Sequence, residues 1–264
     1  MATNYAKKAL EILREEGPVE LSKRSSRFIS RQPLKWLDPQ YHRRFKFHTW
    51  KNHLQNRIRY DAPPEPYRTI EIKPRNIQFR IWYKKDGIPI TNDKRGGLAQ
   101  IKAGSWDKSR FCEDVEKLWQ VKGLKERFVE EKSWTETAYY NHLTSNRKVS
   151  KEEAMKRCNF YDRLFKSIDK NGYEVGHVGE NFSGTFSSRE KLEVLITIGR
   201  NGEIYLWDGH HRFTIGRLLD LKIPAHVVCR HKQWQELRDE IHNNGLPEGR
   251  EDLRDHPDLQ DVLN

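Results

Sequence analysis

The sequence predicts an α+β fold, and three observations carry this prediction. Helical periodicity marks the first 60 residues and returns after residue 113. Short segments of alternating polar and apolar residues lie between residues 67 and 103, as expected for strands. Near residues 194–207 a β-branched run is followed by an Asn-Gly turn and a second short strand. Together they indicate an α+β body with an N-terminal basic helical arm and a small antiparallel sheet.

The charge of the chain is concentrated near its N-terminus. The 264 residues carry a net charge of +11, with 35% hydrophobic and 33% charged residues, which suits one large domain or one domain with an arm. Residues 1–60 hold 14 Lys or Arg and 5 Asp or Glu, a balance of +9. Such an arm predicts an anionic partner, either a lipid surface or a nucleic acid.

Two short helices are expected at the start of this arm. Residues 3–16 show helical spacing that Gly17-Pro18 ends, and a second pattern runs from about Val19 to Ser30. Because both helices are basic and amphipathic, residues 1–31 could lie on an anionic membrane surface. The alternative is that they pack on the body of the protein.

Residues 41–60 interleave basic and aromatic side chains. This pattern fits single-stranded nucleic acid, through phosphate contacts and base stacking. A helix whose aromatic residues face the core explains the same pattern more simply. The proline-rich break at 62–66 then predicts a boundary between an arm at 1–62 and a body at 67–264.

The first part of the body should hold the small sheet and then helices. Strands are expected at Thr69–Lys73, Gln78–Tyr83 and Leu98–Ala103. Helical patterns follow at Glu113–Lys132, and two capping boxes, at 133–136 and 150–153, each predict a helix start, the second helix running to about Ile168.

The last third alternates strands and helices. Strands are expected at Val194–Ile198 and Ile204–Trp207, joined by a type I′ turn at Arg200–Glu203. A helix from His210 to about Leu219, a strand at Ala225–Cys229 and a helix from Lys232 to about His242 follow. From Asn243 onward the chain is polar and is expected to be loosely held.

The five residues Asp208-Gly209-His210-His211-Arg212 join the second of these strands to the helix. A helix start carries unpaired N–H groups and positive potential, so it binds phosphate readily, and Gly209 permits close approach. Arg212 adds a forked donor, and His210 and His211 can donate hydrogen bonds or move a proton. Asp208 can orient a histidine, act as a base or bind a magnesium ion. The alternative is structural: Asp208 caps the helix and Gly209 turns the chain.

Other residues are candidates for the same site. Arg230 and His231 end the next strand and are expected at the same edge, where they would bind phosphate. Glu193, at the start of the first strand, and Glu180, in a glycine-rich stretch at 176–184, are candidate catalytic carboxylates. Asp107 is either a further carboxylate of the site or part of a surface turn.

Residues 192–241 resemble the ParB/sulfiredoxin superfamily. The resemblance rests on a strand ending in Leu206-Trp207, the DGHHR turn at 208–212, a helix ending in LLDLK at 218–222 and the strand IPAHVV at 223–228. It implies a ParB/sulfiredoxin-like mixed core at 170–242, in which the Gly-X-X-Arg turn binds nucleotide phosphates. Members include DNA-partitioning CTPases, sulfiredoxins and an archaeal free-serine kinase.

Two departures from the superfamily narrow the expected function. Sulfiredoxins carry a reactive cysteine where this chain has His210, which argues against sulfinic-acid repair. Partition proteins continue into a helix-turn-helix module, whereas only 22 residues, 243–264, follow the last expected helix here. The resemblance therefore favours a nucleotide-binding or kinase-like protein.

The layout of the whole chain also resembles uncharacterised archaeal proteins found with cell-surface glycan genes. The segments that carry this resemblance are KALEILREEGPVEL, GSWD, RFVEEKSWTETAYY and IGRNGEIYLWDGHHR. It suggests a setting rather than a reaction, and it favours membrane contact over nucleic-acid contact for the arm.

The leading hypothesis is a nucleotide-binding protein with phosphotransferase activity, using ATP, ADP or CTP with magnesium held by Asp208. The alternatives are a ParB-like DNA-binding or nuclease protein and a non-catalytic membrane-associated accessory protein of cell-surface glycan assembly. The three cysteines are scattered, so neither zinc nor a disulfide framework is expected. No apolar run is long enough to cross a bilayer and no signal peptide is evident, so we expect a cytoplasmic protein, free or peripheral at the inner membrane face.

Overall fold

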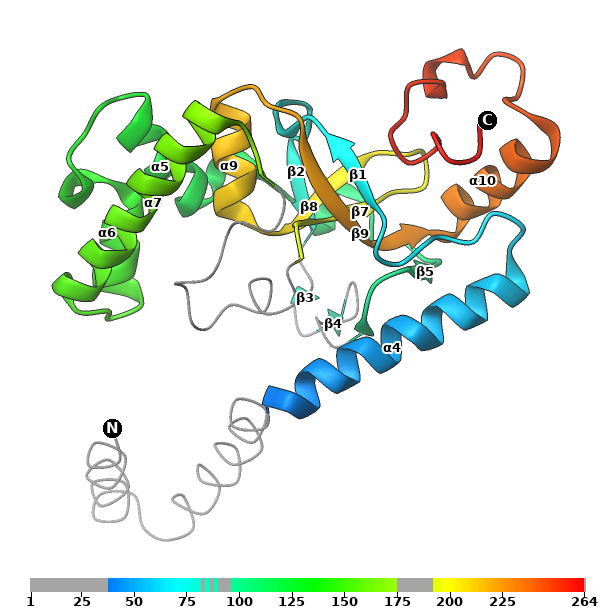
Figure 1. Ribbon diagram of the computed structural model, residues 1–264, viewed down its shortest axis with the longest axis horizontal. Coiled ribbons are helices and arrows are strands. Elements are labelled where there is room, and N and C mark those ends of the chain that lie inside the picture. Colours follow the sequence, from blue (N-terminus) through cyan, green and yellow to red (C-terminus); the bar gives the residue numbers. More distant parts are fainter. Residues whose placement is uncertain (1–37, 82–83, 86–87, 90–95, 175–191, 264) are drawn as a thin grey trace, which may run out of the picture. The chain divides into compact units, whose positions relative to one another are not determined.

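The structure, a computed structural model, describes residues 38–81, 84–85, 88–89, 96–174 and 192–263. The chain forms two compact units, Met1–Lys46 and Phe47–Asn264 (Figure 1). The two helices expected within residues 1–31 lie outside the described residues, as does Glu180 with its glycine-rich stretch. In the described part of the chain, no helix is long and apolar enough to span a membrane.

Helix α4 (Asp38–Arg59) crosses the boundary between the two units, which lies before the boundary expected at 62–66. The proline-rich segment instead belongs to the second unit. The Ala62 N–H donates to the Asp239 carboxylate at 2.9 Å, and the Gln235 amide donates to the Ala62 carbonyl at 2.8 Å. Proline here fixes a turn against helix α10 (Lys232–Asn244) rather than opening a linker.

A mixed seven-stranded sheet forms the centre of the second unit and confirms the α+β class. The strand order is β1-β9-β7-β8-β2-β6, and β5 also pairs with β9. The strands are β1 (Thr69–Ile72), β2 (Phe79–Ile81), β5 (Gln100–Lys102), β6 (Cys112–Asp114), β7 (Val194–Ile198), β8 (Ile204–Asp208) and β9 (Ile223–His231).

The expected small antiparallel sheet does not form as a separate unit. Its three strands exist as β1, β2 and β5, but none pairs with another. β1 is antiparallel and β5 parallel to β9, while β2 is parallel to β8. Each short strand extends the buried strands β7–β9, which bury apolar side chains on both faces. Only β3 (Lys84–Lys85) and β4 (Ile88–Pro89) form a separate two-stranded sheet in the described chain.

The expected hairpin between β7 and β8 is confirmed, but its turn type is not I′. Gly202 has φ 96°, whereas Asn201 is not among the described residues with positive φ, and a type I′ turn needs both. The Gly202 N–H donates to the Gly199 carbonyl at 3.2 Å, which closes a turn around Arg200 and Asn201. A Cβ at Gly202 would lie 2.7 Å from the Trp234 ring, so only glycine fits there.

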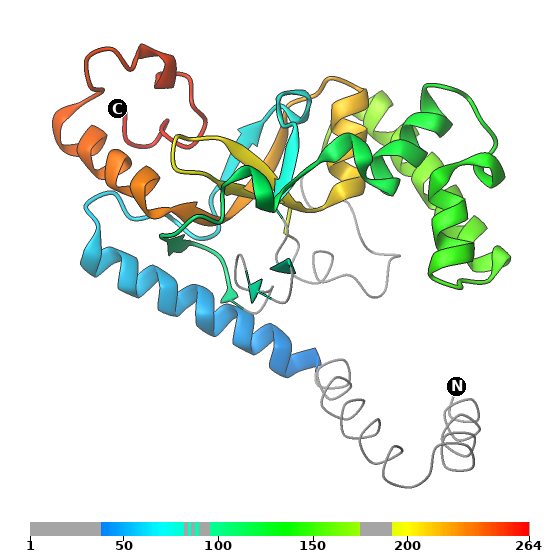
Figure 2. The ribbon, with the colours of Figure 1, turned by 180° about the vertical axis from the view of Figure 1, so that it is seen from behind.

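Helices lie at both ends of the sheet. At one end are α5 (Trp119–Phe128), α6 (Ala138–Asn141), α7 (Lys151–Asn171) and α9 (His210–Leu218), and at the other is α10 (Figures 1 and 2). A π-helix, His142–Asn146, follows α6. The capping box at Ser133 is confirmed, with the Ser133 N–H donating to the Glu136 carboxylate at 3.1 Å. At Ser150 the expected helix start is confirmed by the N-cap bond, in which Ser150 accepts from the Glu153 N–H at 3.2 Å.

Two of the expected elements change character in the structure. The helix expected from Glu113 begins only at Trp119, because residues 112–114 form β6 and the short 3-10 helix Val115–Lys117 places Val115 and Leu118 in the sheet core. The C-terminal tail is not loose. Leu253, Leu259 and Val262 are buried against the sheet, after the 3-10 helix Glu251–Leu253.

Candidate anion site at the start of helix α9

The turn between β8 and α9 is tight and depends on glycine. Gly209 has φ 85° and ψ 27°, in the left-handed region. A Cβ at this position would lie 3.1 Å from the Val194 Cα. The Asp208 Oδ1 atom accepts a hydrogen bond from the Gly209 N–H at 2.8 Å, so the carboxylate holds the turn that it precedes. Gly209 therefore turns the chain as expected, but it is itself the N-cap residue and no side chain caps α9, so the cap expected from Asp208 is not present.

The first turn of α9 carries backbone N–H groups that no helical hydrogen bond uses. The first helical hydrogen bond runs from the Phe213 N–H to the Gly209 carbonyl, at 3.0 Å. The N–H groups of residues 210–212 therefore precede the first helical bond and contribute the positive end of the helix dipole. This arrangement suits an anion.

His210 lies between Asp208 and an arginine that the sequence analysis missed. Its Nδ1 atom is 3.5 Å from Asp208 Oδ1, and its Nε2 atom is 3.4 Å from Arg80 Nη1. Arg80 comes from β2, opposite Leu206 of β8 in the parallel register, and its Nε–H donates to Glu113 at 2.5 Å. The side chain of His210 is 14% exposed and that of Arg80 is 18% exposed, so both reach the surface only partly.

Arg212, the expected phosphate clamp, is used inside the fold. Its Nη1 donates to Glu193 Oε2 at 2.9 Å, and its Nη2 donates to the Leu192 carbonyl at 2.9 Å. The Tyr173 hydroxyl donates to the same Glu193 oxygen at 2.6 Å. The side chains of Arg212 and Glu193 are 9% and 2% exposed. Both residues therefore anchor α9 to the start of β7, and these contacts use the groups that were expected to clamp phosphate and to act as a catalytic carboxylate.

His211 points away from the helix start, into an aromatic cluster. Its ring stacks on Tyr161 at 4.2 Å between centroids and meets Tyr139 edge-on at 5.4 Å. Its Nε2 atom is buried and has no hydrogen-bond partner among the described residues. Burial, with a smaller contribution from the neighbouring His210, lowers the pKa of His211 to about 3. The ring is neutral at pH 7, so His211 is neither the expected phosphate ligand nor a proton carrier at neutral pH.

A second cation stands near the turn, on the helical side. The guanidinium of the exposed Arg147 lies over the Trp119 ring, 5.1 Å from its centroid, and His142 stacks on the same ring at 4.1 Å. Trp119 also meets the His211 ring at 6.3 Å, and the positive charge of Arg147 contributes to the lowered pKa of His211. The π-helix after α6 positions His142 and ends at Arg147, a geometry often found at functional sites.

Arg230 and His231 are not at this edge, contrary to expectation. Leu195 of β7 lies beside Asp208 of β8 on one side and His226 of β9 on the other. Arg230 of β9 lies beside Ile198, at the other end of β7. β9 is longer than the expected strand, so its end lies beyond the site. His226, which is buried and whose pKa is lowered by burial, is the β9 histidine nearest the turn by register.

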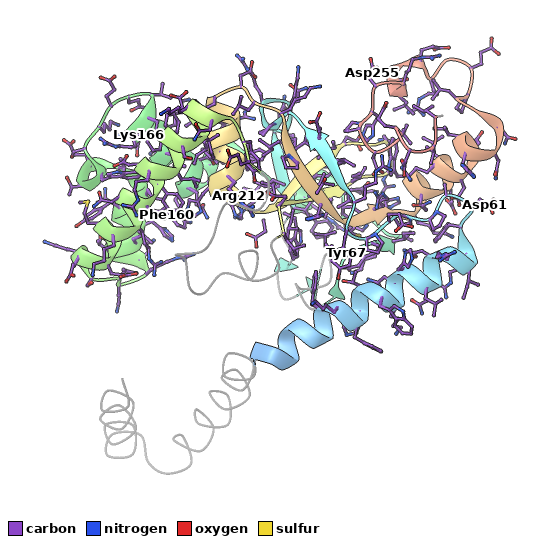
Figure 3. All side chains as sticks on the ribbon, viewed as in Figure 1. Asp61, Tyr67, Phe160, Lys166, Arg212 and Asp255 are labelled. Carbon is purple, nitrogen blue, oxygen red and sulfur yellow. The ribbon has the colours of Figure 1, made fainter. Side chains whose placement is uncertain are left out.

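At the far end of the sheet these residues have structural partners. Arg230 donates to Asp258 at 2.8 Å and 2.5 Å. Burial tends to raise the pKa of Asp258, but Arg230 and Arg238 outweigh it and hold the pKa at about 2. The His231 Nε2 lies 3.0 Å from the Gly104 carbonyl. Figure 3 shows Arg212 and Asp255 of the tail on opposite sides of the sheet.

Asp107 is likewise structural. Its carboxylate accepts from the Arg200 side chain at 2.8 Å and 2.7 Å and from the Arg200 N–H at 2.9 Å, which ties down the β7–β8 turn. Burial alone would raise its pKa, but these hydrogen bonds lower it. Asp107 is buried and lies at the hairpin, so it supplies no carboxylate to the start of α9.

A cleft of about 790 Å³ lies elsewhere, between β1 and the C-terminal tail. Ile70, Ile72 and Ile77 line it but are at most 5% exposed. His256 also lines it, yet both of its ring nitrogens have partners, the Gly202 carbonyl and the Asp258 N–H. Charged side chains also line the cleft, among them Arg68, Lys73 and Lys222.

In the described part of the chain, no group of three or more His, Cys, Asp or Glu residues is arranged to hold a metal ion. Asp208 is the one carboxylate that the turn itself supplies. No family model matches the chain, and neither a curated protein nor a solved structure matches it.

Proposed function

We propose that the protein binds a nucleotide through its phosphates, which would lie on the start of α9. The observation that carries the proposal is that the start of α9, which follows the turn at Gly209 and has no side-chain cap, lies beside the Arg80–His210 pair. The resemblance of residues 192–241 to the ParB/sulfiredoxin superfamily supports the same assignment. Arg80 would replace Arg212 as the guanidinium that contacts phosphate oxygens.

The charges around the turn suit a phosphate with a proton-transfer partner. Arg80 pairs with Glu113 through Nε and Nη2 and turns its Nη1 toward His210, and Arg147 adds an exposed cation from the helical side. The backbone N–H groups of α9 supply donors that need no charge. Because Arg80 donates toward Nε2 of His210 and Asp208 faces its Nδ1, the neutral tautomer favoured here carries its proton on Nδ1 and accepts on Nε2.

This tautomer would allow phosphoryl transfer. An acceptor hydroxyl oxygen would attack the terminal phosphorus, and the bond between that phosphorus and the bridging oxygen would break, with the electron pair leaving on the nucleoside diphosphate. The hydroxyl proton would pass to Nε2 of His210, and Asp208 would stabilise the imidazolium that forms. Magnesium usually reaches such sites with the nucleotide and needs one or two protein carboxylates, and Asp208 would be that ligand.

Titration of ATP, ADP and CTP with magnesium tests this proposal. Isothermal calorimetry would compare the wild-type protein with Arg80→Ala and with Arg75→Ala. Arg75 is the matched control, since it is an exposed arginine that pairs with Asp220 after the other end of α9. Loss of a charged hydrogen bond is worth about 1.5–3 kcal/mol, so Arg80→Ala should weaken binding at least about tenfold.

Arg75→Ala should bind like the wild type. Equal affinities of all three proteins, or no binding of any nucleotide by the wild type, would overturn the proposal.

The alternatives expected from the sequence draw less support. A histidine nuclease built on Asp208, His210 and His211 would lack one of its three groups, because His211 is turned inward. Membrane attachment through residues 1–31 depends on a segment outside the described residues, whereas the basic and aromatic residues 41–60 expected to bind nucleic acid lie largely in α4. Both remain predictions.

A further inference from the structure

The C-terminal half of α4 presents an apolar stripe to solvent. Phe47, Trp50, Leu54 and Ile58 are 55%, 59%, 47% and 78% exposed. Their spacing of three, four and four residues places them along one face of the helix. These four make up most of the seven large apolar residues that are exposed in the described chain, so the stripe is a concentration and not scattered exposure.

The opposite face of this helix is polar and holds it in place. The Leu98 N–H donates to Thr49 Oγ1 at 3.0 Å, and the amides of Asn52 and Asn56 donate to the carbonyls of Leu98 and Ala99, each at 2.8 Å. A surface helix normally buries its apolar face and exposes its polar one. Here hydrogen bonds fix the reverse orientation, so the stripe cannot turn inward without breaking them. Side chains on α4 extend away from the sheet in Figure 3.

Basic residues flank the stripe, and no acidic residue lies between 47 and 60. Lys51, Arg57 and Arg59 are exposed. None of the three has an ion-pair partner in the described part of the chain. Within the described residues, this surface therefore combines exposed apolar side chains with unpaired positive charge.

We propose that this stripe, Phe47, Trp50, Leu54 and Ile58, docks the protein on an anionic lipid surface. Trp and Phe suit the interfacial region of a bilayer, and Leu and Ile suit the acyl boundary. The three flanking cations would face anionic headgroups, each contributing electrostatic attraction. The site is separate from the start of α9, and the inference does not depend on nucleotide binding.

Two other occupants fit less well. Single-stranded nucleic acid would stack on Phe47 and Trp50, whose rings lie 6.1 Å apart, but it would gain nothing from covering Leu54 and Ile58. A second copy of the chain would also bury the stripe. It would, however, bring Lys51, Arg57 and Arg59 of the two copies close together, and these like charges repel each other. A lipid surface uses both the apolar stripe and its charge.

Vesicle sedimentation with the full chain tests the inference. Vesicles of phosphatidylcholine with 30% phosphatidylglycerol, roughly a typical anionic content, would be compared with vesicles of phosphatidylcholine alone. The wild type should bind the anionic vesicles and bind the neutral ones much less. The double variant Trp50→Glu/Ile58→Glu should lose at least about tenfold in partitioning, because two large apolar groups no longer insert.

Val129→Glu is the matched control, since Val129 is 58% exposed after another helix. This variant should partition like the wild type, and all the proteins should show the same circular dichroism and thermal midpoint. Three results would overturn the inference. The first is unchanged partitioning of the double variant. The second is a wild-type protein that is a dimer in light scattering and binds no vesicles, together with a double variant that is a monomer. The third is oligonucleotide binding lost in Trp50→Ala and retained in Ile58→Glu, again without vesicle binding.

Discussion

Arg212 and Glu193 form a buried ion pair that joins the first turn of α9 to the start of β7. The Nη1 and Oε2 atoms are 2.9 Å apart, and Tyr173 donates to the same carboxylate oxygen. The arginine of the DGHHR turn thus stabilises the geometry that presents the turn, and it does not itself reach the surface. The residue that would contact a ligand, Arg80, comes from a different strand.

Replacing Arg212 with Ala should therefore act on stability. Breaking a buried pair by removing one partner leaves an uncompensated charge, here Glu193, and typically costs about 3–5 kcal/mol. Urea unfolding should show this loss for Arg212→Ala. Tyr173→Phe, which removes one hydrogen bond to the same carboxylate, should lose only about 1 kcal/mol. A folded Arg212→Ala protein of unchanged stability would show that the pair does not hold α9.

How far the sequence predicts this site depends on which contacts are local. The hairpin and the start of α9 follow from neighbouring residues, since the β-branched run, Asn201-Gly202 and Asp208-Gly209 all act within a few positions. The partners of the turn do not. Arg80 reaches His210 only because β2 pairs in parallel with β8, and no local pattern specifies that pairing.

The dependence on strand pairing also explains why the structure places Arg212 and Arg230 differently from expectation. Chemistry alone assigns Arg212 to phosphate, because its buried partner lies 19 residues earlier and is visible only once the strands are aligned. Arg230 was expected at the site because the end of β9 was not known relative to β7. Residue type was informative about the α+β class, and strand register decided which side chains meet.

Substituting Gly209 with Ala should destabilise the protein and weaken nucleotide binding. Gly209 has φ 85°, and a Cβ would meet the Val194 backbone at 3.1 Å. The left-handed conformation costs a non-glycine residue about 1–2 kcal/mol, and the close contact adds to that. Thermal unfolding and the nucleotide titration would measure the two effects.

Gly245→Ala is the control for this change. Gly245 has φ 79°, but a Cβ there would meet nothing within 4 Å. The Gly245→Ala variant should lose only the stability that the left-handed conformation costs, and it should bind nucleotide with wild-type affinity. Equal stability losses in the two variants would show that the contact with Val194 is unimportant.

His211 should make the protein less stable in mild acid. Its pKa in the folded protein is about 3, below the ordinary 6.5, because burial disfavours the charged ring. Between these two values the unfolded chain binds the proton and the folded protein does not. The stability of the folded state is therefore complete above pH 6.5 and falls as the pH drops toward 3, by at most about 1.4 kcal/mol per pH unit.

His211→Phe should remove this dependence. Phenylalanine keeps an aromatic ring against Tyr161 and removes the buried Nε2 that has no partner in the described chain. Urea unfolding of both proteins between pH 7 and pH 4 would measure the slopes. Parallel slopes would mean that the buried ring already titrates freely in the folded state.

Asp258 should dominate a second acid transition, at lower pH. It is buried, and it accepts from Arg230 at 2.8 Å and 2.5 Å and from the Trp234 indole at 2.9 Å. Although burial raises its pKa, Arg230 and Arg238 hold it at about 2, below the ordinary 3.8. The stability from this carboxylate is therefore complete above about pH 4 and is lost as the pH falls through 2.

Asp258→Asn should lower the stability at neutral pH, and the loss should depend on pH. At pH 7 it leaves two buried arginines with a neutral partner, so unfolding should become easier by about 3–5 kcal/mol, and the deficit should shrink as the pH approaches 2. Asp261→Asn tests a more exposed carboxylate that also pairs with Arg238, at 2.9 Å, and it should cost about 1 kcal/mol or less. If the deficit of Asp258→Asn stays constant from pH 7 to pH 2, the buried carboxylate is not the group whose protonation releases the C-terminal tail in acid.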